Sequence, residues 1–291
     1  MQDRRNHYIP QFYLKGFLDY RVEPPQKPSL WVLDKKEDTL CRKGTKNVAK
    51  INGYYDMKLM TGEITTVVES FFSKQIEGPS SLILKKILGY MPINEDERFQ
   101  FSEFIYYSLV RVPNFLNYMS WFHKNGSKLN FDKTKVELTK AKIEAAGIGD
   151  EGISTLELMI EMSRFFVPMI YKMNWQFFRA SKNQYFVTSD NPVILNNPDE
   201  KQINLSFSGW ENPGIHLTFP LSSNMCLRAT WTKRSKIYVK ADLKFMRAIN
   251  FRTSFYATRY VFSSRPILPP PIDSSFFYNE IDIYESKSNW E

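Results

Sequence analysis

The chain has 291 residues, of which 43% are hydrophobic and 24% are charged. These values are typical of a globular protein, so they exclude a wholly disordered chain and a long coiled coil. No segment approaches the roughly 18 consecutive apolar residues that a membrane helix needs, and the amino-terminus lacks signal-peptide character. We therefore expect a cytoplasmic protein with no membrane partner.

Three features of the composition bear on function. The formal net charge of +8 favours partners that carry phosphate, nucleic acid among them, although the basic residues are scattered and a mildly basic surface is the alternative. The two cysteines, Cys41 and Cys226, lie too far apart to match a zinc-ligand spacing. The 23 phenylalanines favour an aromatic core over a surface on which bases stack.

Short strands with turn signals are predicted at both ends of the sequence. Residues 30–33 and 39–42 predict an amino-terminal β-hairpin. Beyond Met173, residues 175–178 and 185–187 predict a second hairpin. Further strands are expected at residues 193–195, 203–207, 215–219, 225–231, 237–239 and 260–262. Together the later strands predict an antiparallel β meander.

Between these strands the apolar residues recur at helical spacing. A helix is expected from Ile64 to Ile87, with a break or kink at Gly78-Pro79. Asn94 and Glu97 match a capping box that begins a helix through residue 122, which Pro113 should kink. Other helices are expected over residues 133–146, 154–173 and 242–255.

This order predicts an α+β fold with an amino-terminal β-hairpin, several core helices, a carboxyl-terminal antiparallel β meander and a final helix. We expect one domain over residues 1–264 and a proline-containing tail over residues 265–291. No glycine-rich phosphate loop follows a strand, which argues against a Rossmann or P-loop enzyme.

The opening segment contains the first candidate for chemistry, His7. An imidazole can act as a general base or a metal ligand near neutral pH. The alternative is that His7 and Arg5 only anchor the amino-terminus by hydrogen bonds.

A second candidate is Asp190, which follows Thr188 and Ser189 where a strand ends in a turn. A carboxylate in such a place can ligate a metal or act as a base, and the two hydroxyls can contribute to a site. The alternative is an Asx turn, in which Asp190 or Asn191 bonds to nearby backbone before Pro192.

Two glutamates and an arginine complete the set. Glu69 and Glu77 lie about 80° apart around one predicted helix, and with Asp190 and His7 they could surround a divalent cation. The alternative is that both glutamates lie on a solvated face. Arg111 is in an apolar helix and must find a partner, which is either one of these carboxylates or an anionic ligand.

Residues 6–17, from Asn6 to Phe17, closely resemble the opening motif of a bacterial family, domain of unknown function 4238. The likeness continues through residues 30–35, the helix with Glu69 and Glu77, Arg111-Val112-Pro113, residues 188–192, residues 219–222 and Asn250. It covers most of the chain, to about Ser264. The resemblance implies one domain in an intracellular prokaryotic or phage setting, and it implies no activity.

The leading hypothesis is a metal-dependent phosphoester hydrolase, similar to a nuclease, that acts on nucleic acid. Glu69, Glu77 and Asp190 would hold Mg²⁺ or Mn²⁺, His7 would act as base or ligand, and Arg111 would stabilise anionic charge. Substrate contacts are expected from Arg5, Tyr8, Gln11, Thr188 and Ser189.

The alternative hypothesis is a non-catalytic module that binds nucleic acid, a nucleotide or a partner protein. Arg5, His7 and Arg111 would then contact anions, and Tyr8 and Tyr13 would form a stacking platform. A third possibility is that the motifs are purely architectural, in which case His7→Ala would mainly lower stability. The sequence predicts neither the oligomeric state nor the substrate.

Overall fold

The computed structural model describes residues 5–54, 57–58, 64–65, 67–113, 115, 155–196, 210 and 213–266. These residues form an α+β fold, as the sequence predicts. The longer helices are α2 (Val67–Phe71), α3 (Gly78–Leu88), α4 (Glu95–Val110), α7 (Thr155–Lys172) and α8 (Leu243–Tyr256). The opening segment contains strand β1 (Arg5–His7), helix α1 (Gln11–Leu14) and a 3₁₀ turn, η1 (Lys15–Phe17).

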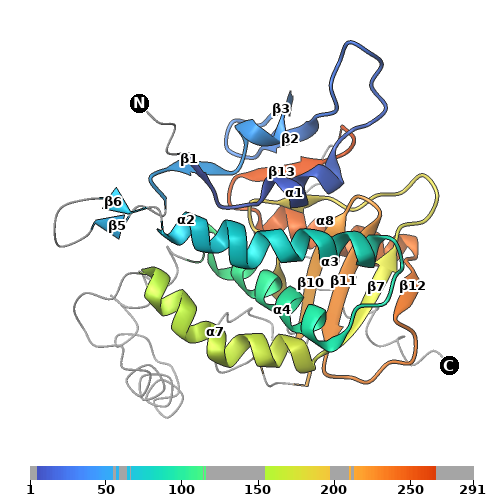
Figure 1. Cartoon of the computed structure of the whole chain (residues 1–291). Coiled ribbons are helices and arrows are strands. Elements are labelled where there is room, and N and C mark those ends of the chain that lie inside the picture. The colour runs from blue at the N-terminus through green and yellow to red at the C-terminus, as the bar shows by residue number, and fades with distance from the viewer. Residues whose placement is uncertain are drawn as a thin grey trace, which may run out of the picture.

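Two larger sheets form the centre of the molecule (Figure 1). One has the order β12-β7-β11-β10-β9 and the other the order β3-β2-β13-β8. The strands of the first are β7 (Asn174–Arg179), β9 (Ile194–Asn196), β10 (His216–Ser222), β11 (Met225–Thr230) and β12 (Tyr238–Lys240). Those of the second are β2 (Leu30–Asp34), β3 (Thr39–Lys43), β8 (Thr188–Ser189) and β13 (Tyr260–Ser263).

The pairing within these sheets is antiparallel except at one edge. The pairs β9–β10, β10–β11 and β11–β7 are antiparallel, which agrees with the predicted meander, while β12 runs parallel to β7. The predicted amino-terminal hairpin is confirmed, because β2 and β3 pair in register with Val32 opposite Cys41.

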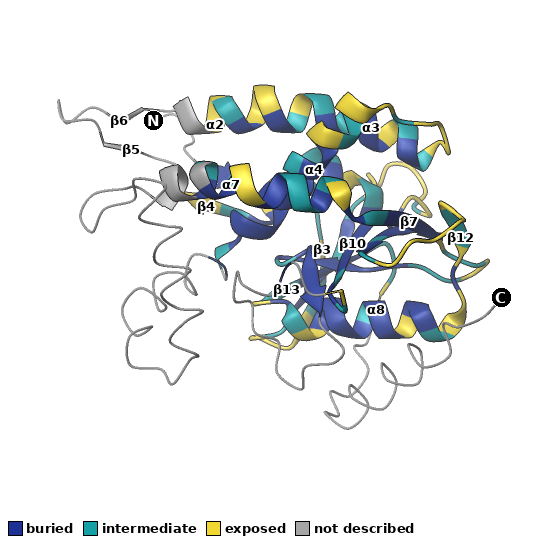
Figure 2. Ribbon diagram, turned by 90° about the horizontal axis from the view of Figure 1, so that it is seen from below, coloured by how far each residue is buried: buried dark blue, intermediate teal, exposed yellow. Residues whose placement is uncertain are grey.

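The helices cover opposite sides of the five-stranded sheet (Figure 2). Helices α3, α4 and α7 lie on one side, and α8 lies on the other. Most residues of α4 from Phe101 to Val110 are buried. A helix that is buried around most of its surface belongs inside a domain, which explains its position among α3, α7 and the sheet.

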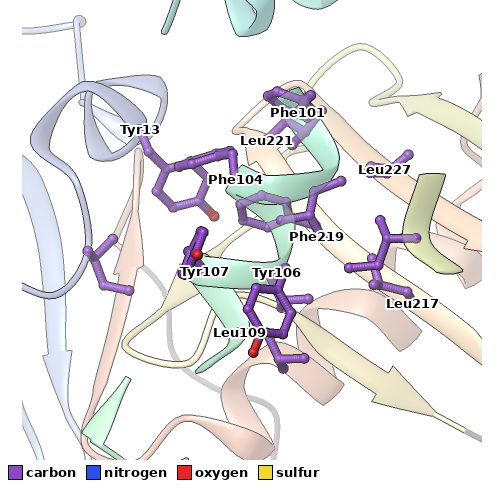
Figure 3. Close-up of a cluster of buried hydrophobic side chains, with 14 of the residues drawn as sticks. Tyr13, Phe101, Phe104, Tyr106, Tyr107, Leu109, Leu217, Phe219, Leu221 and Leu227 are labelled. Atoms are coloured by element: carbon purple, nitrogen blue, oxygen red, sulfur yellow. The ribbon is translucent and has the colours of Figure 1, made fainter. Parts of the chain in front are cut away.

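Aromatic side chains fill the space between α4 and the sheet (Figure 3). The ring of Tyr13 stacks on that of Phe219 with the centroids 5.1 Å apart, and Phe104 lies 5.8 Å from Phe219. Each of these three residues is at most 1% exposed. The phenylalanine-rich composition therefore serves the core, as predicted.

The predicted hairpin of residues 175–178 and 185–187 is wrong. Strand β7 pairs with β11 and β12, whereas the chain beyond it leads to β8, which pairs with β13 in the other sheet. The turn signal at residues 181–184 is real, since Gln184 N donates to the Ser181 carbonyl. Local turn chemistry could not reveal that the chain changes sheets there.

The helix expected from Ile64 to Ile87 has a different course. Residues 64–65 form strand β6 (Ile64–Thr65), which pairs with β5 (Met57–Lys58). Between α2 and α3 the chain forms a π-helical segment, η3 (Phe72–Glu77), and Gly78 N donates to the Ser73 carbonyl five residues back. Pro79 has no N–H and therefore cannot donate to a carbonyl one helical turn earlier. The wider π-helical turn lies directly before Gly78-Pro79, where a break was expected.

Helix α4 begins as predicted and ends earlier. Asn94 and Glu97 form the capping box, with Glu97 N donating to Asn94 Oδ1 over 2.8 Å. The helix ends at Val110 instead of continuing with a kink at Pro113, because a residue that precedes proline disfavours the helical conformation.

Other predictions fall outside the described residues. These are the helix at 133–146, the strand at 203–207 and the greater part of the tail at 265–291. The division into a domain over 1–264 and a tail stays a prediction. In the ranges that the structure does describe, no helix is long and apolar enough to cross a membrane.

Candidate functional site

The opening segment divides into two parts that face different surroundings. Strand β1 pairs with β4 (Lys50–Asn52), which sets His7 opposite Lys50. Asn6 Nδ2 donates to Glu69 Oε2 over 2.9 Å, so the first part lies beside the helix that carries the two glutamates. From Tyr8 onward the segment turns into the core, where Tyr13 and Phe17 are buried.

Glu77 and Arg111 form an ion pair next to this strand. Arg111 Nη1 donates to Glu77 Oε1 over 2.9 Å, and the two side chains are 1% and 25% exposed. The Arg111 guanidinium carbon lies 5.4 Å from the centre of the Phe72 ring, and Tyr54 donates to the Arg111 carbonyl over 2.9 Å. Among the partners left open by the sequence, Arg111 thus pairs with Glu77.

The rest of the Arg111 guanidinium is buried without a partner. Its Nε and Nη2 atoms have no hydrogen-bond partner in the part of the chain that the structure describes. Nε and Nη2 form the edge through which Arg21 binds the two oxygens of Asp19, at 2.9 and 3.0 Å. Arg259 donates from the same two atoms to Asp34, at 2.9 and 2.7 Å. Arg111 therefore presents a two-pronged donor edge of the kind that fits carboxylate and phosphate.

His7 is half-buried, and its Nε2 atom also lacks a hydrogen-bond partner among the described residues. Burial, and then the positive charge of Lys50, lower the pKa of His7 below its usual 6.5. The backbone carbonyls of Thr45 and Lys46 and the Glu77 carboxylate act in the opposite direction. The imidazole is therefore held neutral near pH 7, with Glu77 close enough to influence it.

Glu77 connects His7 with Arg111, because it pairs with Arg111 and lies within electrostatic reach of His7. Hereafter the His7–Arg111 site comprises these three residues and Glu69, which accepts a hydrogen bond from Asn6, the neighbour of His7 in β1. Glu77 is the last residue of η3, and π-helical turns often occur at functional sites because they redirect a side chain. The exposed Glu69 lies at its rim, held by Asn6.

Asp190 does not join this site. It is 3% exposed, and its carboxylate accepts hydrogen bonds from the backbone N–H groups of Thr258, Arg259 and Tyr260 at 2.8, 2.7 and 2.9 Å. Burial raises the pKa of Asp190, while the three N–H donors and nearby Lys35 oppose this effect. The carboxylate thus fastens the segment between α8 and β13, and it forms no local Asx turn.

Thr188 and Ser189, predicted to contact substrate, are also engaged within the fold. Both are fully buried. The Thr188 hydroxyl lies 2.6 Å from that of Tyr13, which donates to the Pro220 carbonyl. Ser189 Oγ donates to the Asn191 carbonyl and accepts from its N–H, which makes the turn. Tyr13 is therefore a core residue and not a stacking platform.

The remaining predicted contacts are Tyr8, Gln11 and Arg5. Burial raises the pKa of Tyr8, and its ring lies 6.0 Å from that of Tyr54. Gln11 begins α1 and accepts from Thr45 Oγ1 at 3.5 Å. The backbone of Arg5 belongs to β1, and its side chain lies outside the described part.

The predicted metal centre of Glu69, Glu77, Asp190 and His7 is not assembled. Among the described residues, no three His, Cys, Asp or Glu side chains lie close enough together to hold a metal ion. The physical reason is that Asp190 is taken up by three backbone N–H groups and Glu77 by Arg111.

Three residues that contact the site were not predicted from the sequence as site residues. Asn6 holds Glu69, Phe72 lies against the Arg111 guanidinium, and Tyr54 binds its carbonyl. Of these, only Tyr54 lies next to a local sequence pattern, the Asn52-Gly53 turn that it follows. The other two depend on contacts between segments far apart in the sequence.

One comparison with known proteins gives a match. The model of a family described as "Protein of unknown function (DUF4238)" matches residues 5–266. No curated protein and no solved structure matches the chain.

Proposed function

Because the chain belongs to the DUF4238 family, whose description states no activity, we propose a function from the geometry. The protein binds a phosphate-bearing ligand through the Nε–Nη2 edge of Arg111 and hydrolyses its phosphoester bond next to His7. The ligand is a nucleotide or a nucleic acid.

The observation that carries this proposal is the unpaired edge of Arg111, whose side chain is 1% exposed. Leaving a buried polar group without a hydrogen bond costs about 1–3 kcal/mol, and more for a charged one. A bound oxyanion would satisfy both N–H groups at once. Glu77 compensates the charge without using this edge.

Two further observations favour phosphate over carboxylate. The whole chain carries a net charge of +8, which attracts polyanions over a long range. At the site itself, Lys50 is close enough to lower the pKa of His7. A phosphoryl group has more negative charge and more acceptor oxygens than a carboxylate, so this setting supports it better.

The first test measures binding of a 5′-phosphorylated single-stranded DNA and of the same oligonucleotide without its phosphate. We expect the phosphorylated form to bind more tightly to wild type, and Arg111→Lys to reduce this preference about 10-fold or more, because a lysine cannot form the two-pronged contact. Arg21→Lys is the matched control, since the same exchange is made where Asp19 already occupies the edge.

Glu77→Gln is a second variant with the opposite expected result. It removes the carboxylate that neutralises part of the positive charge of Arg111, so the phosphorylated oligonucleotide should bind at least as tightly as to wild type. Inorganic phosphate should also raise the unfolding temperature of wild type more than that of Arg111→Lys.

An equal affinity of wild type and Arg111→Lys for the phosphorylated oligonucleotide would contradict the binding proposal. Turnover is followed separately as released phosphate, with EDTA and with Mg²⁺ or Mn²⁺, because a phosphate group can itself bring a cation. Binding that depends on Arg111 without any phosphate release would indicate a non-catalytic binding module.

A further inference from the structure

Hydrolysis of a phosphoester requires an atom that attacks phosphorus, and the side chains of the site differ in whether they can supply one. Glu77 Oε1 is bonded to Arg111, and Glu69 Oε2 accepts from Asn6. Burial raises the pKa of Tyr8, so its phenolate is disfavoured. His7 Nε2 is buried, belongs to a ring that is held neutral, and has no partner among the described residues. It is the described side-chain atom of the site best placed to supply a lone pair.

We infer that His7 is a covalent catalyst whose Nε2 atom accepts a phosphoryl group from a phosphomonoester and passes it to water. This inference rests on the proposed function and adds the nucleophile and the substrate class. The ring proton would reside on Nδ1, because the carbonyls of Thr45 and Lys46 act on the imidazole as hydrogen-bond acceptors.

The reaction balances in two steps. In the first, the Nε2 lone pair forms an N–P bond, the P–O ester bond breaks, and the leaving oxygen takes a proton from water. In the second, a water oxygen attacks phosphorus, the N–P electron pair returns to Nε2, and the proton that this water loses neutralises the hydroxide left by the first step. The products are an alcohol, inorganic phosphate and neutral His7. Arg111 binds two non-bridging oxygens and stabilises their charge in both steps.

The substrate class follows from burial. The Arg111 side chain is 1% exposed, so protein encloses its Nε–Nη2 edge on most sides and leaves little room for a long ligand. A terminal phosphoryl group can enter there with three non-bridging oxygens, whereas an internal phosphodiester would bring a chain on both sides. A nucleotide and a phosphorylated nucleic-acid end share this chemistry.

The test uses 4-nitrophenyl phosphate, a 5′-mononucleotide and a 5′-phosphorylated oligonucleotide as probes. After turnover by wild type and an alkaline quench, mass spectrometry should find phosphohistidine in the peptide that contains His7. His7→Gln should lower the phosphate release rate at least about 100-fold while leaving Arg111-dependent phosphate binding intact. His216→Gln, which removes a histidine of β10, is the matched control and should behave as wild type.

A second variant separates a nucleophile from a general base. Imidazole added to His7→Gly should restore turnover and yield N-phosphoimidazole, which ³¹P NMR distinguishes from phosphate. Rescue that yields only phosphate would show base catalysis and overturn the inference.

Absence of both phosphohistidine in wild type and phosphoimidazole from His7→Gly would also overturn it. If phosphate binding still depended on Arg111, only the nucleophile would be wrong. Loss of that binding as well would contradict the proposed function itself. The relative rates with the mononucleotide and the oligonucleotide distinguish the two sources of the phosphoryl group.

Discussion

Arg111 and His7 differ from other polar residues of the protein in how many of their hydrogen-bonding atoms have a partner. Arg21 and Arg259 each bind an aspartate through two nitrogens and remain partly exposed. Arg111 is almost fully buried and uses one nitrogen for Glu77. Among the described residues, Nε and Nη2 of Arg111 and Nε2 of His7 have no hydrogen-bond partner, and the proposed function assigns them to a ligand.

The environment of His7 predicts how stability depends on pH. Burial lowers the pKa of His7 in the folded state below the 6.5 expected in the unfolded chain. As the pH falls through 6.5, the unfolded chain binds a proton before the folded protein does, so the free energy of unfolding decreases. Above 6.5 both states are neutral and this contribution is constant.

Wild type should therefore lose stability relative to His7→Gln as the pH falls below 6.5, by at most about 1.4 kcal/mol per pH unit. Urea unfolding of both proteins between pH 5 and pH 8 measures the difference, with His216→Gln as control. Parallel pH profiles for wild type and His7→Gln would mean that the folded protein does not lower this pKa.

Three polar side chains, those of Asp190, Lys35 and Asn250, connect helix α8 and the segment after it with neighbouring elements. Asp190 accepts from the backbone between α8 and β13. Lys35, after β2, donates to the carbonyls of Ser254, Phe255 and Ala257 at the end of α8. Asn250, within α8, binds the backbone on either side of Phe186. These bonds hold α8 against the four-stranded sheet.

Asp190→Ala should destabilise the protein by about 2–4 kcal/mol, because it leaves three backbone N–H groups without their acceptor. Asp242→Ala is the matched control, at the start of α8. Asp242 caps this helix by accepting from the N–H group of Phe245, and the loss of such a cap costs about 1 kcal/mol. Denaturant unfolding measures both.

Equal destabilisation by the two variants would contradict the fastening role of Asp190. Phosphate binding at the His7–Arg111 site should remain in Asp190→Ala under conditions where that variant is folded.

At the scale of the whole molecule, the opening segment joins the candidate site to the five-stranded sheet. Its first part carries His7, and its end lies on the β10–β11 turn, where Ser223 N donates to the Gly16 carbonyl over 2.9 Å. A Cβ atom at Gly16 would lie 3.1 Å from both the Leu221 carbonyl oxygen and Ser222 Cβ. This distance is shorter than most Cβ contacts, so a side chain at residue 16 would require the neighbouring backbone to shift.

Gly16→Ala should destabilise the protein by about 1–3 kcal/mol, because the backbone of residues 221–222 must move to admit the methyl group. Gly44→Ala is the control, since a Cβ there meets nothing within 4 Å and its φ of −71° suits any residue. Thermal unfolding compares the two variants. A Gly16→Ala protein as stable as Gly44→Ala would show that the contact is looser than the structure indicates.

Local sequence patterns were sufficient to predict the fold class, the amino-terminal hairpin and the capping box at Asn94. These features depend on the period of apolar residues and on hydrogen bonds between near neighbours. The sequence also indicated that Arg111 needs a partner, since a guanidinium in an apolar helix cannot remain without one.

Which polar residues meet depends on the tertiary structure. The sequence suggested Asp190 and His7 as members of one site, yet the Asp190 carboxylate is bonded to backbone N–H groups of a segment about 70 residues away, whereas His7 lies within electrostatic reach of Glu77. The strand after the turn at residues 181–184 likewise joined another sheet. Such choices depend on packing between distant segments, and local sequence patterns carry no information about that packing.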